Sequence, residues 1–90
     1  MGRRNIIEKI QHGQYVFTQH AYQQMLARDI YIRQIPDAIQ QGRVVKRWNE
    51  RDGEKLAIVG PRFNGDYIKV LVKDADTPRI ITVCYPYEEI

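Results

Sequence analysis

Two side chains in the first half of the chain, His20 and Arg28, have the types and the spacing needed to act on a phosphate. His20 follows Thr18, a natural helix N-cap, by two residues, so it is expected in the first turn of a helix. The helix N-terminus disfavours a charged imidazolium, and the neutral ring can act as a general base. Arg28 comes eight residues later, about two helical turns, so the two side chains are expected on roughly one side.

Both residues also have a structural interpretation. His20 could tie the start of its helix to a sheet. Arg28 could pair with Asp29, Asp37 or a carbonyl at the end of the helix. The sequence leaves both alternatives open.

A second pair, Arg79 and Tyr85, lies near the end of the chain in a strand-like run. The two residues are six positions apart, and side chains an even number of positions apart in a strand share a face. We therefore expect them on one face of a sheet. Tyr85 precedes Pro86, so it could also serve only in packing.

The densest basic stretch of the chain contains an aromatic residue, Trp48. Basic side chains interleaved with an aromatic suit a nucleic-acid backbone whose bases can stack. The alternative is a solvated edge strand protected by charge. Lys69, on the polar face of a neighbouring strand, and Arg62, in a loop, add further positive charge. The candidate RNA-binding residues are Arg43, Lys46, Arg47, Trp48, Arg62 and Lys69.

Other chemistries lack the residues they need. Two His and one Cys, far apart, do not form a metal site, and no Gly-rich phosphate loop or Ser-His-Asp arrangement is present, so we expect no metal and no cofactor. Cys84 lies in the run IITVCYP and is expected to be a buried small hydrophobe. A single cysteine cannot form an internal disulfide, which favours the reducing cytoplasm.

Length and composition indicate one domain over residues 1–90. The hydrophobic fraction of 43% is enough for a core, and the net charge of +3 is modest for a strong RNA binder. No apolar run approaches the roughly 20 residues that span a bilayer, so no membrane association is expected. Charged residues interrupt the apolar part of the N-terminal stretch, which does not resemble a secretory signal.

Helical signals come first along the chain. Asn5 is expected to cap a short helix over 6–12, and two further helices are expected over 19–28 and 33–41, with Pro36 in the first turn of the last. Residues 15–17 are either a short strand or an extended entry to the second helix. The side chains expected to be mostly buried on a sheet are Met25, Leu26, Ile35 and Ile39.

From residue 44 the hydrophobic period changes to two, which is typical of strands. Asp52-Gly53 is a hairpin signal. Strands are expected over 44–50, 56–59, 67–73 and 79–85, paired consecutively in one antiparallel sheet. Helices followed by a hairpin-linked meander predict an α+β fold with two to three N-terminal helices on a four-stranded antiparallel meander.

The run from Thr18 to Ile30 resembles the opening motif of the DUF4258 family. That motif is a Thr, then His-Ala two residues on, then Arg-Met, then an Arg with an Ile two residues after it. Gly42 matches the family's Gly between its second helix and first meander strand, and residues 80–86 resemble its closing strand. One position departs from the motif, because Gln24 stands where the family has the Arg before the Met.

The resemblance implies a RelE-like fold, since the family is grouped with the RelE-like bacterial toxins. The best-known members of that superfamily cleave mRNA and are silenced by a partner antitoxin, so the resemblance implies a ribonuclease-type toxin or a relative that has lost the activity. Metal-independent cleavage needs a base for the 2′-OH, a cation for the phosphorane and an acid for the leaving oxygen. The resemblance implies catalytic roles for Arg79, on the phosphorane, and Tyr85, in stacking or proton transfer, beside His20 and Arg28.

The resulting hypothesis is a RelE-like toxin acting as a metal-independent endoribonuclease on RNA or ribosome-bound mRNA, with an antitoxin protein as partner. The alternatives are a non-catalytic domain that binds a protein through a sheet edge or helix groove, and an RNA-binding domain without catalysis.

Overall fold

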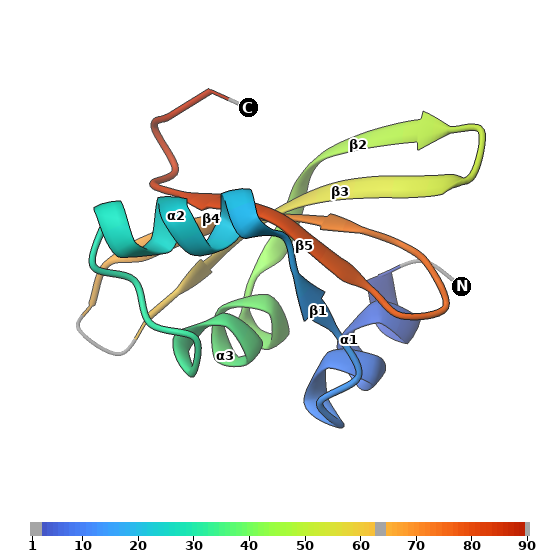
Figure 1. Cartoon of the computed structure of the whole chain (residues 1–90), viewed down its shortest axis with the longest axis horizontal. Helices are drawn as coiled ribbons and strands as arrows, with labels where there is room; N and C mark the ends of the chain where they lie inside the picture. The colour runs from blue at the N-terminus through green and yellow to red at the C-terminus, as the bar shows by residue number, and fades with distance from the viewer. Residues whose placement is uncertain (1–2, 63–64, 90) are drawn as a thin grey trace.

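The computed structural model describes residues 3–62 and 65–89, in which three helices accompany one five-stranded sheet (Figure 1). The predicted α+β class is confirmed. The elements in chain order are α1 (Arg3–Gln11), β1 (Val16–Phe17), α2 (Gln19–Ala27), α3 (Gln34–Gln41), β2 (Arg43–Glu50), β3 (Gly53–Pro61), β4 (Tyr67–Lys73) and β5 (Arg79–Cys84).

The sheet has the strand order β1-β5-β4-β3-β2 and is mixed. Strands β2 to β5 pair consecutively and antiparallel, as expected. β1 adds a fifth strand, parallel to β5, through Val16 opposite Arg79 and Phe17 opposite Ile80. The predicted four-stranded antiparallel sheet is therefore wrong in this respect. A strand of two residues is too short to show a period, and its partner lies more than 60 residues away.

Capping and turn residues in the sequence determine where several of the helices and strands begin or end. Thr18 caps α2, because its Oγ1 accepts a hydrogen bond from the Ala21 amide at 3.0 Å. At the β2–β3 turn Gly53 has φ +129°, and a Cβ there would lie 2.6 Å from the Asp74 carbonyl oxygen. The expected cap at Asn5 is wrong, because α1 begins at Arg3 and Asn5 lies inside its first turn.

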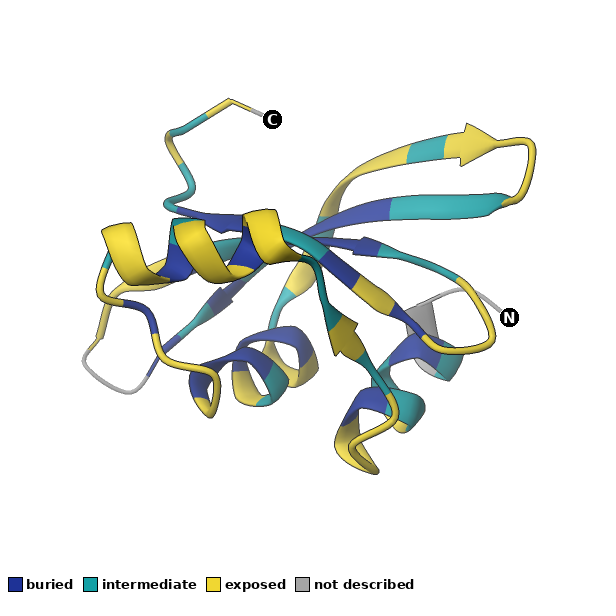
Figure 2. Cartoon of the chain, in the orientation of Figure 1, coloured by how far each residue is buried: buried dark blue, intermediate teal, exposed yellow. Residues whose placement is uncertain are grey.

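The core lies between the helices and one face of the sheet, whose buried side chains come mainly from β3, β4 and β5 (Figure 2). α3 packs on β3, α1 packs on α3, and α2 packs along β5 just beyond β1. Met25, Ile35 and Ile39 are buried as predicted. Leu26 is 82% exposed, against expectation, because α2 buries only the stripe of Ala21 and Met25 and Leu26 points about 100° away from it.

The opposite side of the sheet, here called the open face, carries charged and aromatic side chains. The strand registers place on it Lys46, Trp48, Lys55, Ala57, Lys69, Leu71 and Lys73. Residues 85–89, here called the C-terminal segment, follow β5 without forming a helix or strand. In the described ranges, 3–62 and 65–89, no helix is long and apolar enough to cross a membrane.

Candidate functional site

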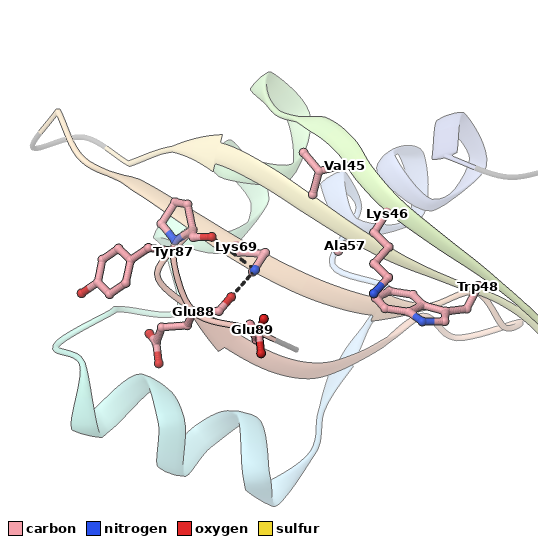
Figure 3. A pocket seen from close by; sticks show the side chains of 9 residues that line it. Val45, Lys46, Trp48, Ala57, Lys69, Tyr87, Glu88 and Glu89 are labelled. Carbon is pink, nitrogen blue, oxygen red and sulfur yellow. Dashed lines mark hydrogen bonds between the residues drawn. The ribbon is translucent and has the colours of Figure 1, made fainter.

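A groove of about 450 Å³ lies on the open face, between the β2–β3 hairpin and the C-terminal segment (Figure 3). β2 contributes Val45, Lys46 and Trp48 to its lining. Lys69 of β4 and residues 86–89 form the other wall. Three of the six predicted RNA-binding residues, Lys46, Trp48 and Lys69, therefore meet in one groove.

Two ammonium groups lie over the indole ring of Trp48. Lys46 Nζ is 4.9 Å and Lys55 Nζ is 5.1 Å from the centre of the indole ring. Cation–π attraction at these distances keeps the charges beside the aromatic surface. A nucleobase that stacked on Trp48 would displace at least one of these ammonium groups from the ring, and the displaced cation would then be free to pair with a phosphate.

Lys69 holds the C-terminal segment against the sheet. Its ammonium donates hydrogen bonds to the backbone carbonyls of Pro86, at 3.3 Å, and of Glu88 (Figure 3). The backbone amide of Glu88 donates to the Tyr85 carbonyl at 3.0 Å and closes a turn. The groove wall on this side is thus a short polar segment fixed by a lysine.

Arg28, the residue that caps the C-terminus of α2, pairs with Glu88. Its Nε donates to Glu88 Oε2 at 2.7 Å and its Nη2 to Oε1, so the pair is bidentate. The Tyr85 amide also donates to Oε2, at 2.8 Å, and Nη1 donates to the Gln24 side chain. The hydrogen bonds from Arg28, and then that from the Tyr85 amide, lower the pKa of Glu88 to about 2. Arg28 therefore has a structural role. Its Nη1 donates to the Gln24 carbonyl in the last turn of α2 at 3.4 Å, which is one of the expected alternatives, whereas its ion pair with Glu88 was not expected.

His20 lies exposed on α2 near the same segment. With Gln24, Arg28, Thr82 and Cys84 it lines a second cleft, of about 200 Å³. Residues 88 and 89 line both the cleft and the groove, so α2 and β4 approach the C-terminal segment from two sides. His20, Arg28 and Lys69 are therefore grouped around one segment.

Tyr85 takes part in this cluster through its backbone amide, which donates to Glu88, and through the packing of its ring. Its hydroxyl donates to the Arg28 carbonyl at 2.8 Å, and its ring stacks on Tyr87 with the centroids 5.8 Å apart. The ring also packs against the core. The side chain thus helps to fix the end of α2.

Arg79 is not brought to this cluster. It lies at the far end of β5, opposite Lys73, whereas Cys84 lies opposite Lys69. Five strand residues span about 16 Å. The expectation that Arg79 and Tyr85 share a face is wrong, because a register shift in β5 leaves Ile81 unpaired and turns Tyr85 towards the core.

The remaining predicted RNA-binding residues lie outside the groove. Arg62 is only 8% exposed, and its guanidinium donates to the Asp29 carbonyl at 3.2 Å and to Asp66 at 3.3 Å. Arg47 pairs with Glu54 at 3.5 Å. Arg43 is exposed at the start of β2 and does not line the groove.

A model of one protein family matches residues 17–85, and its description is a domain of unknown function, DUF4258. The chain belongs to the DUF4258 family. No significant match was found among curated proteins or among solved structures.

In this DUF4258 domain, most residues of the motif between Thr18 and Ile30 serve to cap the helix or to fill the core. Thr18 caps α2, and Ala21, Met25 and Ile30 are buried in the core. His20 and Arg28 are the motif residues that face the cleft, and Gln24 lies between them. An Arg at position 24 would put a second guanidinium beside Arg28, because the Gln24 side chain accepts a hydrogen bond from Arg28 Nη1.

The sequence reasoning missed Glu88, which organises the cluster. Two adjacent acidic residues, Glu88 and Glu89, in a basic chain could have indicated an ion pair. The sequence does not show which basic residue they pair with, because Arg28 lies 60 residues away. Cys84 is buried as predicted, and burial raises the pKa of its thiol, which opposes nucleophilic use. Within residues 3–62 and 65–89 no group of three or more His, Cys, Asp or Glu side chains could hold a metal ion.

Proposed function

We propose that this DUF4258 domain is a RelE-like toxin that binds single-stranded RNA in the groove of the open face and cleaves it without a metal. The observation that carries the proposal is the contact of the Lys46 and Lys55 ammonium groups with the ring of Trp48, in a groove that Lys69 also lines. Stacking on one aromatic with flanking cations is how proteins bind single strands with little sequence preference. The modest net charge of +3 predicts micromolar rather than tight binding.

The chemistry of cleavage assigns roles to the residues beside the groove. His20, exposed at the start of α2, would take the 2′-OH proton as the 2′-oxygen attacks the phosphorus, and water would protonate the 5′-oxygen that leaves. Arg28 would stabilise the charge of the phosphorane, and Tyr85, bonded to the Arg28 carbonyl, would position it. Arg79, about 16 Å along β5 from Cys84, would bind a flanking phosphate rather than the scissile one.

Trp48 supplies the binding assay, since it is the only tryptophan in the chain. We expect a single-stranded RNA oligonucleotide to quench its fluorescence in a salt-dependent titration. Lys46→Ala and Lys69→Ala should each weaken binding, whereas Arg47→Ala, which removes a charge of the same strand outside the groove, should weaken it less. Unchanged fluorescence at low salt would refute RNA binding in the groove.

Cleavage is tested separately. RNA incubated with the protein in EDTA, and mRNA in cells that express it without a partner, should be degraded by the wild type and spared by His20→Ala. If the wild type binds RNA but leaves it intact, including ribosome-bound mRNA, the domain binds without catalysis.

A second candidate function, a non-catalytic interaction domain, is favoured by an exposed apolar patch. Tyr22, Leu26, Tyr31 and Ile32 line a shallow hollow of about 260 Å³ on α2 and the loop after it. The partner expected there is a protein that inserts apolar side chains into the hollow. Copurification of such a partner, abolished by Leu26→Glu, from cells in which the wild-type domain leaves mRNA intact would support this function.

A further inference from the structure

The carboxylate of Glu88 occupies a site with the donors of an oxoanion receptor. The Arg28 fork binds both of its oxygens, and the Tyr85 amide adds a third hydrogen bond at 2.8 Å. The Lys69 ammonium donates a hydrogen bond to the backbone carbonyl of the same residue, Glu88. A planar guanidinium fork accepts a carboxylate or a phosphate with the same bidentate geometry.

The residue that fills this site belongs to a lightly anchored segment. Residues 85–89 form no strand or helix, and Tyr87 and Glu89 are exposed. Residues 86–89 are anchored by the turn to Tyr85, the stacking of Tyr87 on Tyr85, the Arg28 pair and the Lys69 hydrogen bonds. An anionic ligand that bound Arg28 and Lys69 would therefore have to break polar contacts of the segment. Displacing the segment would expose little apolar surface that is now buried.

The position of the segment connects this site with the groove. Glu88 and Glu89 line both the groove that contains Trp48 and the cleft that contains His20. With the segment in place, Arg28 and Lys69 are both engaged by the protein itself. If the segment moved, the two cations would face the route between groove and cleft.

We propose that Arg28, Lys69 and the Tyr85 amide form a phosphate-binding site, and that Glu88 fills it in the resting protein as an internal competitor. The identity of the phosphate as that of an RNA backbone rests on the proposed function. RNA binding then displaces the C-terminal segment. The contacts that Glu88 makes with Arg28 and the Tyr85 amide oppose this displacement and so lower the affinity for RNA.

The test compares Glu88→Gln with Glu89→Gln. Each variant removes one negative charge from the same groove wall, so the general electrostatic gain in RNA affinity is matched. Only Glu88→Gln also releases Arg28. We expect its RNA affinity to exceed that of Glu89→Gln by about threefold to fivefold, and Arg28→Lys in the Glu88→Gln background to remove the excess. Circular dichroism checks that each variant is folded.

Inorganic phosphate tests the site without RNA. In Glu88→Gln, added phosphate should shift the NMR resonances of the Tyr85 amide and of Arg28 Nε–H, and should shift them much less in Glu89→Gln. Equal RNA affinity of the two variants, or unmoved resonances, would overturn the proposal. Phosphate shifts without RNA binding by any variant would support the anion site and refute the RNA function.

Discussion

Thr18→Ala should destabilise the domain by more than the loss of an ordinary helix cap. Thr18 Oγ1 accepts a hydrogen bond from the Ala21 amide at 3.0 Å. The same hydroxyl donates to the Ile81 carbonyl, in β5, at 2.9 Å. Thr18 therefore caps α2 and ties the start of the helix to the strand that it packs against.

The magnitude follows from these two hydrogen bonds. Loss of an N-cap costs about 1 kcal/mol. A second hydrogen bond lost from a half-buried position costs about another 1 kcal/mol, because the Ile81 carbonyl loses its side-chain donor where β5 is irregular. We expect a decrease of about 2 kcal/mol in the free energy of unfolding.

Urea denaturation measures this decrease. For a domain of this size the slope m is about 1–1.5 kcal/mol/M, so the midpoint should fall by about 1.3–2 M with m unchanged. Thr18→Ser is the control, since it keeps the hydroxyl and should lose much less. If Ala and Ser shift the midpoint equally, the hydroxyl contributes nothing and the reasoning is wrong.

Three further predictions concern packing and pH. Met25→Ala should lower the free energy of unfolding by about 2–5 kcal/mol, whereas Leu26→Glu should stay within about 0.5 kcal/mol in the same melt. Gly60→Ala should be severely destabilising, because its Cβ would overlap the backbone carbonyl of Ala38; soluble expression with an unchanged melting temperature would contradict this. The wild type should be more stable than Glu88→Gln above about pH 4.5, and the difference should vanish as pH falls towards about 2, because the folded pKa lies below the unfolded one. Paired urea melts from pH 7 to pH 2 check the last prediction, and a difference that persists at pH 2 would exclude this carboxylate as its cause.

The C-terminal segment links stability to function in this domain. If Glu88 masks the phosphate site, the contacts that order residues 85–89 are the ones that RNA must break. A variant that loosens the segment and keeps Arg28 and Lys69, such as Glu88→Gln, should then lose stability and gain affinity together. A loss of stability combined with a gain of RNA affinity would show that Glu88 masks the phosphate site. A salt bridge with only a structural role would change stability and leave RNA affinity unchanged.

Local rules in the sequence determined the helices, the meander strands and much of the groove. A cap such as Thr18 or a turn such as Asp52-Gly53 acts within a few residues, and a strand period needs only the strand itself. The interleaving of Lys46 with Trp48 on β2 is likewise local, and it predicted one wall of the groove.

Only the tertiary structure decided which distant groups meet. The pairing of Arg28 with Glu88 joins the end of α2 to the end of the chain, and β1 finds its partner in β5. The register shift at Ile81 reverses the face expected for Tyr85, although nothing in the residues of β5 signals it. Such contacts depend on how whole helices and strands pack. A charged side chain or a strand edge can pair with many partners, and the local sequence does not say which of them the fold will place beside it.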